Sequence, residues 1–587
     1  MKTIKKLQLA AAVAAGLTLA GCGSDSDDTG GSSDIVNCVN GRTVDIAANV
    51  AANTSSVSEE LVTALNSAKT CDTIVIPAGN HAIATELTFD GLGVFGSEGV
   101  MVTNLTIQGA GMAKSTDDNS ATTALNFDAA TGAGSKADGF FISNTKSITF
   151  EDLGVFEAPN NAIKLKDTDG IIIRNVATVW ETDYSSENGA YGLYPVETSN
   201  VLIEDSYVQG SADAGVYVGQ SENIIVRRTE AVKNVAGIEI ENSKNADVYE
   251  NIATGNTGGL LIFDLPIGNG VYGAGVRVYN NTITDNNAPN FATVGNFAGG
   301  VHIVPPGTGM IVLSTSEVEI YNNTITDHKT SSISISSYLL PDGDVAQFPN
   351  QDVGGTVTSY GDIHPYAEVF LDGWSPFVRD INIHDNIITN PTVASAPEGS
   401  LIQDLIDGYA AMNAHGHVTE IPEILYDGVG ELLVNTPITG AAEAGIPDGT
   451  PLGLALAIGI NGTAAALDAN GLETAGLQIT DLGLWASYGN GDRVCQSNNG
   501  GVTAAAVYAT SPTATFDQYP LMITTGNLGD AGSFIPQVPS FNLDVANDVV
   551  EPIPFFLPTD DTMTCGEGVT PFVGTAAVVT FNGEVVE

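Results

Sequence analysis

The chain has 587 residues, of which 69 are acidic and 19 are basic, and its formal net charge at pH 7 is −50. A field of this sign repels nucleic acids and other polyanions, so the composition excludes a nucleic-acid-binding protein. A soluble surface adapted to saline water accounts for most of the acidic excess without any specific partner.

Residues 1–21 predict an export signal peptide, because a start with three lysines is followed by an apolar stretch that ends in small residues. The sequence Leu19-Ala20-Gly21-Cys22 resembles the bacterial lipobox, whose cysteine becomes the lipidated first residue after cleavage. Gly23 is similar to the residue that follows the cysteine in lipoproteins sorted to the outer membrane. We therefore expect an exported protein that a lipid on Cys22 holds to the outer membrane, on either its periplasmic or its outer face.

Residues 22–34 are acidic, polar and rich in glycine, which predicts a flexible tether. Four cysteines remain after Cys22, and an even number in an exported chain indicates two disulfides. Three connectivities are possible, and we favour Cys38 with Cys71 and Cys495 with Cys565, each closing a loop near one end of the folded body.

A capping helix is predicted at the start of the folded body. Ser56-Val57-Ser58-Glu59 has the pattern of a capping box, and the residues after it place an apolar stripe on one helix face. The strand Thr73-Ile-Val-Ile-Pro-Ala-Gly follows. Together, helix and strand resemble the amino-terminal cap of pectate-lyase-like β-helix proteins.

A short Val- and Ile-rich segment recurs along the chain. It begins at Ile148, Ile171, Val201, Ile224, Ala246, Val276, Val318 and Ile381, at intervals of 23, 30, 23, 22, 30, 42 and 63 residues. A unit of 22 or 23 residues with loop insertions is typical of a solenoid, and the alternation of apolar residues indicates strands. We predict an all-β chain, with a right-handed parallel β-helix and its amino-terminal cap over residues 35–390. The pairs Asn280-Asn281, Asn322-Asn323 and Asp385-Asn386 recur at one corner, where stacked amides can satisfy the turns.

Residues 391–480 are rich in Ala, Gly and Leu and are interpreted as an insertion or accessory region, and residues 481–587 as a carboxy-terminal cap region. Lipobox, coils, insertion and cysteine-bearing tail together resemble a family of exported bacterial parallel β-helix repeat-containing proteins, best over about residues 140–340. That resemblance implies a second exported envelope protein as a partner. It transfers no catalytic residue, because fold does not determine function.

One strand per coil can be aligned so that its alternate residues point outward. The first outward row is Lys164, Tyr194, Tyr217, Glu239, Leu261, His302 and Ser334, and the second includes Lys166, Val196, Gly219, Glu241, Phe263 and Val304. At ~4.8 Å per rung, Lys164 to His302 spans roughly 24 Å, enough for several sugar rings. We predict an exposed ladder of Lys164, Lys166, Tyr194, Tyr217, Glu239, Glu241, Phe263 and His302 that binds an extended glycan or an envelope partner. An ordinary solvated sheet face is the competing interpretation.

The segment Tyr191-Gly-Leu-Tyr194-Pro195-Val196-Glu197 resembles the Tyr-Gly-x-Asp-Pro-His-Glu/Asp stretch of mannuronan C5-epimerases. In those enzymes the aspartate and the histidine perform the proton chemistry at C5. Tyr194 and Val196 stand at the matching positions here, and a valine transfers no proton. The resemblance therefore supports the fold and argues against the epimerase activity.

Two further chemistries receive weak support. Glu239 and Glu241 lie two residues apart on one strand, ~6.8 Å, within the ~6.5 to 9.5 Å separation of inverting glycosidases. A Ca²⁺-assisted lyase needs a basic residue near acidic calcium ligands. Lys164 or Lys166 could be that basic residue, and Asp167, Asp183 and Glu197 the ligands. Three functions stay open: a glycan- or partner-binding lipoprotein, which we favour, a polysaccharide lyase, epimerase or glycosidase, and a structural or adhesive surface protein. The sequence identifies neither a catalytic residue nor a metal ligand.

Overall fold

The computed structural model describes residues 36, 38–39, 41–92, 101–117, 120–131, 136–267, 270–292, 300–338, 374–389, 424–426, 494–500, 505–507, 556–557 and 570–586. The predicted signal peptide, Cys22, the tether, Cys565 and nearly all of the predicted insertion lie outside these residues. No helix in the described ranges is both long enough and apolar enough to cross a membrane.

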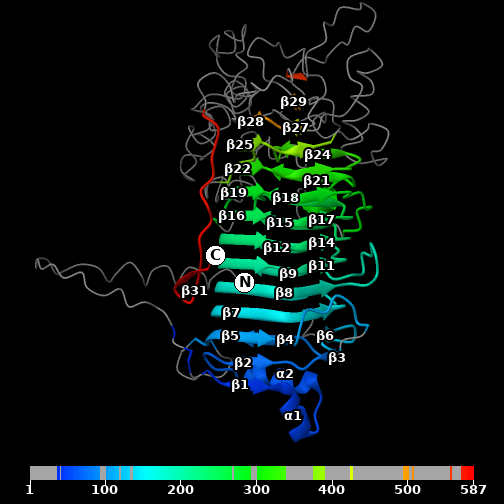
Figure 1. Ribbon diagram of the computed structural model, residues 1–587, viewed down its shortest axis with the longest axis vertical. Coiled ribbons are helices and arrows are strands. Elements are labelled where there is room, and N and C mark those ends of the chain that lie inside the picture. Colours follow the sequence, from blue (N-terminus) through cyan, green and yellow to red (C-terminus); the bar gives the residue numbers. More distant parts are fainter. Residues whose placement is uncertain are drawn as a thin grey trace, which may run out of the picture. The chain divides into compact units, whose positions relative to one another are not determined.

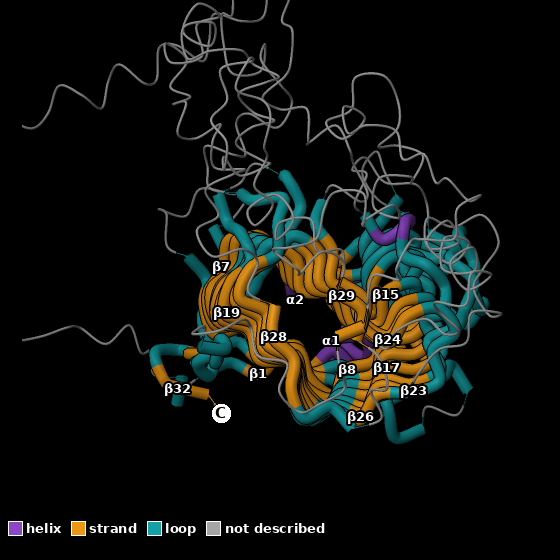
Figure 2. The backbone as a smooth tube through the Cα atoms, turned by 90° about the horizontal axis from the view of Figure 1, so that it is seen from above, coloured by secondary structure: helices purple, strands orange, loops and turns teal. Residues whose placement is uncertain are grey.

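The chain winds into coils whose strands pair in parallel with the next coil, and this produces three sheets, here named A, B and C (Figures 1 and 2). Two long strands run through all three sheets, β7 (Phe140–Phe156) and β8 (Ile163–Val179). Sheet A also contains β4 (Leu87–Asp90), β9 (Leu193–Val196), β12 (Ala214–Gly219), β15 (Ala236–Glu241), β18 (Gly258–Phe263), β21 (Thr308–Leu313), β24 (Ser331–Ser336), β27 (Ile424–Tyr426) and β29 (Ala505–Val507).

Sheet B contains β1 (Thr43–Asp45), β2 (Thr73–Val75), β5 (Thr103–Gln108), β10 (Ser199–Glu204), β13 (Glu222–Arg227), β16 (Lys244–Tyr249), β19 (Ala274–Tyr279), β22 (Ser316–Tyr321), β25 (Arg379–His384) and β28 (Val494–Ser497). Sheet C contains β3 (Gly79–Ala82), β6 (Thr123–Asn126), β11 (Tyr207–Gln209), β14 (Glu230–Val232), β17 (Ile252–Thr254), β20 (Thr282–Thr284), β23 (Thr324–Thr326) and β26 (Ile387–Ile388). The short strand β30 (Phe556–Leu557) pairs antiparallel with β29.

The register of sheet B confirms the repeat. Ile148 pairs with Ile171, Ile171 with Val201, and the series continues through Ile224, Ala246, Val276 and Val318 to Ile381. Strand β28 adds a further rung, because Ile381 pairs with Val494. The inward members of all rungs merge into one buried apolar core, so each coil is held by its neighbours.

A corner of the coil is held by a ladder of asparagine amides. Asn251, Asn281, Asn323 and Asn386 each donate Nδ2 to Oδ1 of the next member, which is Asn499 for the last, at 2.9–3.0 Å. Each Oδ1 also accepts the backbone N–H of the preceding member, as in Asn281 N to Asn323 Oδ1 at 2.9 Å. The predicted stacking of amides at this corner is confirmed.

The amino-terminal end is capped by two helices, α1 (Ile46–Asn53) and α2 (Val57–Asn66). Helix α2 begins with the predicted capping box, in which the Ser56 side chain accepts from Glu59 N and the Glu59 side chain accepts from Ser56 N. Leu61, Ala64 and Leu65 bury the predicted apolar face in the core. The predicted disulfide Cys38–Cys71 is present, and Cys495 is also disulfide-bonded.

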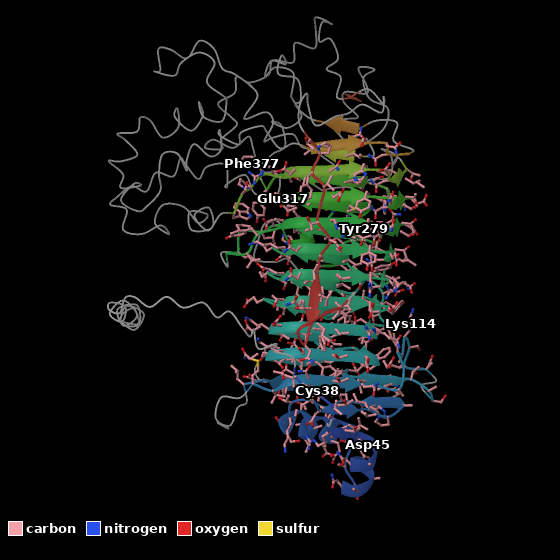
Figure 3. The ribbon with its side chains drawn as sticks, turned by 60° about the vertical axis from the view of Figure 1, so that its left-hand side comes forward. Cys38, Asp45, Lys114, Tyr279, Glu317 and Phe377 are labelled. Atoms are coloured by element: carbon pink, nitrogen blue, oxygen red, sulfur yellow. A yellow bond between two sulfur atoms is a disulfide. The ribbon has the colours of Figure 1, made fainter. Side chains whose placement is uncertain are left out.

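The carboxy-terminal segment, residues 570–586, crosses the outside of sheet B, where Figures 1 to 3 show it against the strands. Its backbone N–H groups donate to outward side chains, as in Gly574 N to Glu319 Oε2 at 3.0 Å and Ala577 N to Asp247 Oδ2 at 3.2 Å. It ends in a hairpin of β31 (Val579–Phe581) and β32 (Glu584–Val586), whose Val579 packs with Ile172, Leu202 and Ile225 of sheet B. This segment, the tail, therefore covers an apolar strip on sheet B.

Candidate functional site

Most of the predicted outward rows lie together on sheet A. Lys164 pairs with Tyr194, Tyr217 with Glu239, and Glu239 with Leu261. In the second row Lys166 pairs with Val196, Gly219 with Glu241, and Glu241 with Phe263. The inside and outside assignment agrees with the packing, because Val216, Ile238 and Leu260 belong to the central core, whereas Tyr217, Leu261 and Phe263 do not.

The prediction for His302 is wrong. Val301–Ile303 form a short 3-10 helix, and the next rung of sheet A is β21, which places Ile311 beside Leu261 and Leu313 beside Phe263. Two apolar segments with similar alternation lie in the 42-residue interval, and the sequence pattern does not tell which one pairs. His302 and Val304 therefore do not belong to the ladder.

The predicted exposure is also wrong at the centre of the ladder. Tyr217 is 5% exposed, Glu239 1% and Glu241 9%, and Phe263 is buried as well. Lys164, Lys166 and Tyr194 are half-buried. The outward row thus divides into a partly open part on β8 and β9 and a closed part on β12, β15 and β18.

Aromatic rings line the partly open part. The ring centroids of Tyr191 and Tyr194 lie 4.4 Å apart, those of Tyr191 and Tyr217 4.8 Å, and those of Tyr194 and Tyr217 5.0 Å. Lys164 Nζ lies 5.2 Å from the Tyr194 centroid and 5.4 Å from that of Phe141 on β7. This group, here called the tyrosine platform, offers ring surface and one ammonium group.

Glu241 is the best-supported carboxyl group beneath the platform. Tyr217 Oη donates to Glu241 Oε1 at 2.7 Å, and Gln220 Nε2 donates to the same oxygen at 3.2 Å. Gly219 permits this geometry, because a Cβ at Gly219 would lie 2.3 Å from the Tyr217 ring. Burial raises the pKa of Glu241 to about 7, and the two hydrogen bonds oppose that rise.

Glu239 has no such support. Its Oε2 is buried without a hydrogen-bond partner among the described residues, and its neighbour on β18 is the apolar Leu261. Burial, together with the charges of Glu241 and Asp213, holds the pKa of Glu239 well above its usual range. Burial at this position therefore favours the protonated form of Glu239.

Asp213 completes the group of acids. It accepts a hydrogen bond from Tyr191, but burial and the Glu241 charge raise its pKa to about 8. Asp213, Glu239 and Glu241, here called the acid cluster, form no ion pair with a lysine or arginine in the described part of the chain. Strongly perturbed carboxyl groups gathered on one face are typical of functional sites.

The sequence did not draw attention to Asp213, Tyr191 and Gln220 as site residues. Asp213 lies just before the start of β12, where strand alternation no longer indicates which side chains point outward. Tyr191 and Gln220 lie in turns, where a strand pattern carries no signal.

The residues predicted for a Ca²⁺-assisted lyase do not all lie close together. Lys166 forms ion pairs with Asp167 and Glu197, whereas Asp183 pairs with Lys233. Among the described residues, no group of three or more His, Cys, Asp or Glu side chains is placed to hold a metal ion.

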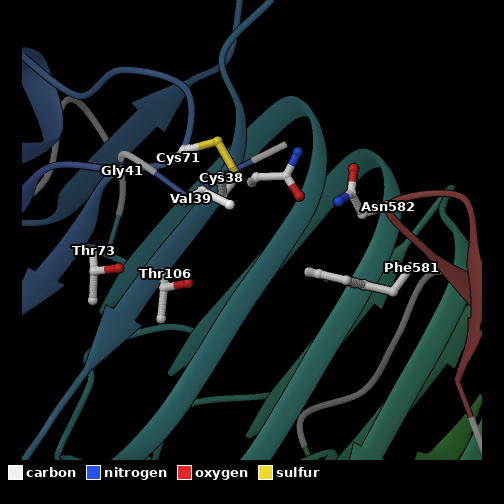
Figure 4. Close-up of a pocket in the computed structure, with 9 residues that line it drawn as sticks. Cys38, Val39, Gly41, Cys71, Thr73, Thr106, Phe581 and Asn582 are labelled. Carbon is white, nitrogen blue, oxygen red and sulfur yellow. A yellow bond between two sulfur atoms is a disulfide. The ribbon is translucent and has the colours of Figure 1, made fainter. Parts of the chain in front are cut away.

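A cavity of ≈ 370 Å³ lies elsewhere, beside the Cys38–Cys71 disulfide (Figure 4). Thr73 and Thr106 of sheet B and Phe581 and Asn582 of the tail line it. Asn582 is already occupied there, since its side chain bonds both N and O of Val36. The cavity belongs to the contact between the tail and the start of the folded body, and no predicted ladder residue lines it.

Comparison with known proteins agrees with the observed topology. Residues 90–273 match the family model described as a right handed beta helix region. The coils form a right-handed parallel β-helix. The predicted fold is thus confirmed, and this β-helix carries both the tyrosine platform and the acid cluster. No sequence among the curated proteins matches the chain.

Several solved structures are similar to this β-helix. A mannuronan C-5 epimerase A-module of Azotobacter vinelandii is 14% identical over 58% of this chain and 85% of that chain, with a TM-score of 0.32. A polygalacturonase of Erwinia carotovora is 14% identical over 53% of this chain and 94% of that chain, with a TM-score of 0.30. The tailspike of Escherichia coli bacteriophage HK620 is 14% identical over 48% of this chain and 56% of that chain, with a TM-score of 0.30.

Proposed function

We propose that this β-helix protein is an envelope lipoprotein, anchored through Cys22 in the outer membrane, that binds a glycan on the outward face of sheet A. The observation that carries the proposal is the tyrosine platform beside the acid cluster on adjacent rungs. Tyrosine rings pack on the apolar faces of sugar rings, and the half-buried Lys164 and Asp213 can form hydrogen bonds with sugar hydroxyls.

The charges at the site favour a neutral glycan over a polyuronate. Of the two lysines on this face, Lys166 is already paired with Asp167 and Glu197. Lys164 remains as the cation of the platform, against three carboxyl groups of the acid cluster. An anionic chain would meet net repulsion as soon as Glu241 ionises, so its binding would weaken with rising pH.

The apolar part of sheet A limits where a glycan can bind. Leu261, Phe263, Ile311 and Leu313 continue the two rows as a buried apolar surface, without hydroxyl or charged groups for a sugar. The glycan therefore lies on the partly open platform on β8 and β9, rather than following the whole length of sheet A.

The test uses the full chain and a fixed set of glycans: laminarin and xylan as neutral chains, alginate and pectate as anionic ones. We expect calorimetric binding of at least one neutral chain. The Tyr194→Ala variant should weaken that binding by about 1 kcal/mol or more, because stacked aromatic side chains often dominate such sites. A matched control is Tyr279→Ala, since Tyr279 belongs to a separate stack on sheet B, with its centroid 4.8 Å from that of Tyr249.

Absence of binding to all four glycans would contradict the proposal. So would equal affinity of Tyr194→Ala and the unaltered protein. Co-purification of a second exported protein in place of a glycan would support the envelope-partner alternative. Labelling of Cys22 with a radioactive fatty acid in cells tests the anchor separately, with Cys22→Ser as its control.

A further inference from the structure

We propose that the cavity beside the Cys38–Cys71 disulfide binds a neutral mono- or disaccharide. This second site is independent of the tyrosine platform, because it lies on sheet B rather than on sheet A. Its volume of ≈ 370 Å³ falls within the range of about 300–1,000 Å³ that is usual for pockets holding small molecules. The site therefore adds a ligand to the proposed function without depending on it.

The cavity arises where the tail stops short of the first rungs of sheet B. Val579 and Phe581 pack on the apolar strip of sheet B, and the chain then turns back in the hairpin of β31 and β32. Thr73 on β2 and Thr106 on β5, two neighbouring rungs nearer the start of the sheet, line the cavity. The start of the folded body, which the disulfide joins to Cys71, forms a further wall (Figure 4). Three separate parts of the chain thus enclose the space.

The lining of this cavity is uncharged. None of the described residues that line it is acidic or basic, although the chain contains 69 acidic residues. Asp72 lies between two lining residues in the sequence, but it is buried and forms an ion pair with Arg42 at 2.5 Å. A charged ligand would lose its hydration without meeting an opposite charge, so the cavity favours a neutral one.

The lining combines an aromatic ring with hydrogen-bonding groups. Phe581 contributes the ring, Asn104 a side-chain amide, and Thr73 and Thr106 two hydroxyl groups on rungs ~4.8 Å apart. Neither of these hydroxyl groups has a hydrogen-bond partner among the described residues. A sugar ring matches this lining, because it has an apolar face of C–H groups and a rim of hydroxyl groups. A wholly apolar ligand would leave the polar groups of the cavity without partners.

A ligand in this cavity touches both the tail and the body of the β-helix. The tail is already joined to the start of the body there, because the Asn582 side chain bonds N and O of Val36 at 2.8 and 3.0 Å. A sugar that contacts Phe581 and Thr106 together binds only while the tail is docked. Such a ligand stabilises the docked tail by mass action, and the docked tail in turn raises the affinity for the ligand.

The experiment uses the full chain with Tyr194→Ala, so that the platform contributes little binding. Cellobiose and N-acetylglucosamine are the neutral probes and glucuronate is an anionic one, each titrated by saturation-transfer NMR. We expect the neutral probes to bind, and glucuronate to bind about 10-fold more weakly because its charge finds no partner. Thr106→Val keeps the branched shape without the hydroxyl group and should weaken binding about 5- to 10-fold. Thr149→Val is the matched control, since Thr149 follows Thr106 in register but does not line the cavity.

Two adjacent valines of the tail test the coupling between the ligand and the tail. Val579→Ser removes an apolar contact of the tail and should weaken cellobiose binding, whereas Val578→Ser, at an exposed position, should not. Saturating cellobiose should also slow hydrogen exchange of the Thr580 and Asn582 amides.

Four outcomes would overturn the inference. These are no binding of either neutral probe, glucuronate binding as tight as that of cellobiose, equal affinities of Thr106→Val and Thr149→Val, and unchanged exchange of the tail amides at saturating cellobiose. None of them bears on the tyrosine platform, which laminarin and xylan test on the protein that retains Tyr194. Failure of the platform would likewise leave this cavity unaffected.

Discussion

Tyr217 donates its hydroxyl to Glu241 Oε1 over 2.7 Å, although its direct neighbour in register is Glu239. The ring therefore lies along its own strand, above Gly219, and reaches diagonally to the next rung. A side chain that points away from the core is thus buried, and its removal should cost stability as a core residue's would.

We predict that Tyr217→Ala destabilises the protein by about 3 to 5 kcal/mol, as large aromatic truncations in cores do. Tyr194→Ala, at a half-buried position on the neighbouring rung, should cost clearly less. Denaturant unfolding of both variants measures the difference. Val216→Asp provides the severe reference, because it places an unpaired charge in the stack. Equal costs for the two tyrosines would contradict the burial of Tyr217.

The acid cluster predicts a stability that falls as pH rises. A carboxyl group whose pKa is higher in the folded than in the unfolded chain stabilises fully below its unfolded pKa. That contribution is lost as pH rises through the folded pKa. The window therefore runs from about 4, the ordinary carboxyl value, to the folded values of about 7 for Glu241 and about 8 for Asp213.

Urea unfolding between pH 4 and pH 9 measures this slope. Other acids in a chain of this charge add to it, so the informative quantity is the difference between the unaltered protein and Asp213→Asn/Glu241→Gln. We expect the double variant to have the flatter profile. Parallel profiles for the two proteins would mean that the pKa values of these carboxyl groups do not differ between the folded and the unfolded chain.

The asparagine ladder should be costly to interrupt. Asn323→Ala leaves Asn281 Nδ2 and the backbone N–H of Asn281 without their acceptor, and it removes a donor to Asn386. Each unsatisfied buried group costs about 1 to 3 kcal/mol, so a total of several kcal/mol is expected. Asn280→Gly is the control, at an exposed neighbouring position with φ of 56° that glycine tolerates, and it should change stability by less than about 0.5 kcal/mol.

The tail offers a pair of adjacent valines for comparison. Val579 is buried against sheet B, whereas Val578 is 52% exposed. Val579→Ser should weaken the docking of the tail by about 1 to 2 kcal/mol, from the loss of buried apolar surface, while Val578→Ser should have little effect. Hydrogen exchange of the amides of Gly574, Ala577 and Thr580 reports the release of the tail directly. Equal exchange in both variants would show that the apolar contact does not hold the tail.

The local sequence pattern alone was enough to predict much of the fold. The intervals from Ile148 to Ile381 predicted the register of sheet B, since each coil must bury its apolar face on the next. The capping box at Ser56, the Cys38–Cys71 pair and the asparagine corner also depend on residues close in sequence or on a strictly repeated position. Strand alternation likewise predicted which side chains of sheet A point inward.

Tertiary structure alone decided the rest. Whether β21 or the segment around His302 forms a rung depends on which of two similar apolar segments completes the stack, and both satisfy the same alternation. The alternation of apolar residues also predicts which side chains of a strand point into the core and which point away from it. It does not predict which segments cover the outward face of the sheet. Tyr217 and Glu239 point outward and are nevertheless buried, and the strip around Leu202 is covered by a tail more than 370 residues later in the chain. Such contacts join residues that are distant in sequence, so no local period records them. The acid cluster arises in the same way, because the stacking of β12 on β15 brings Asp213, Glu239 and Glu241 onto one face.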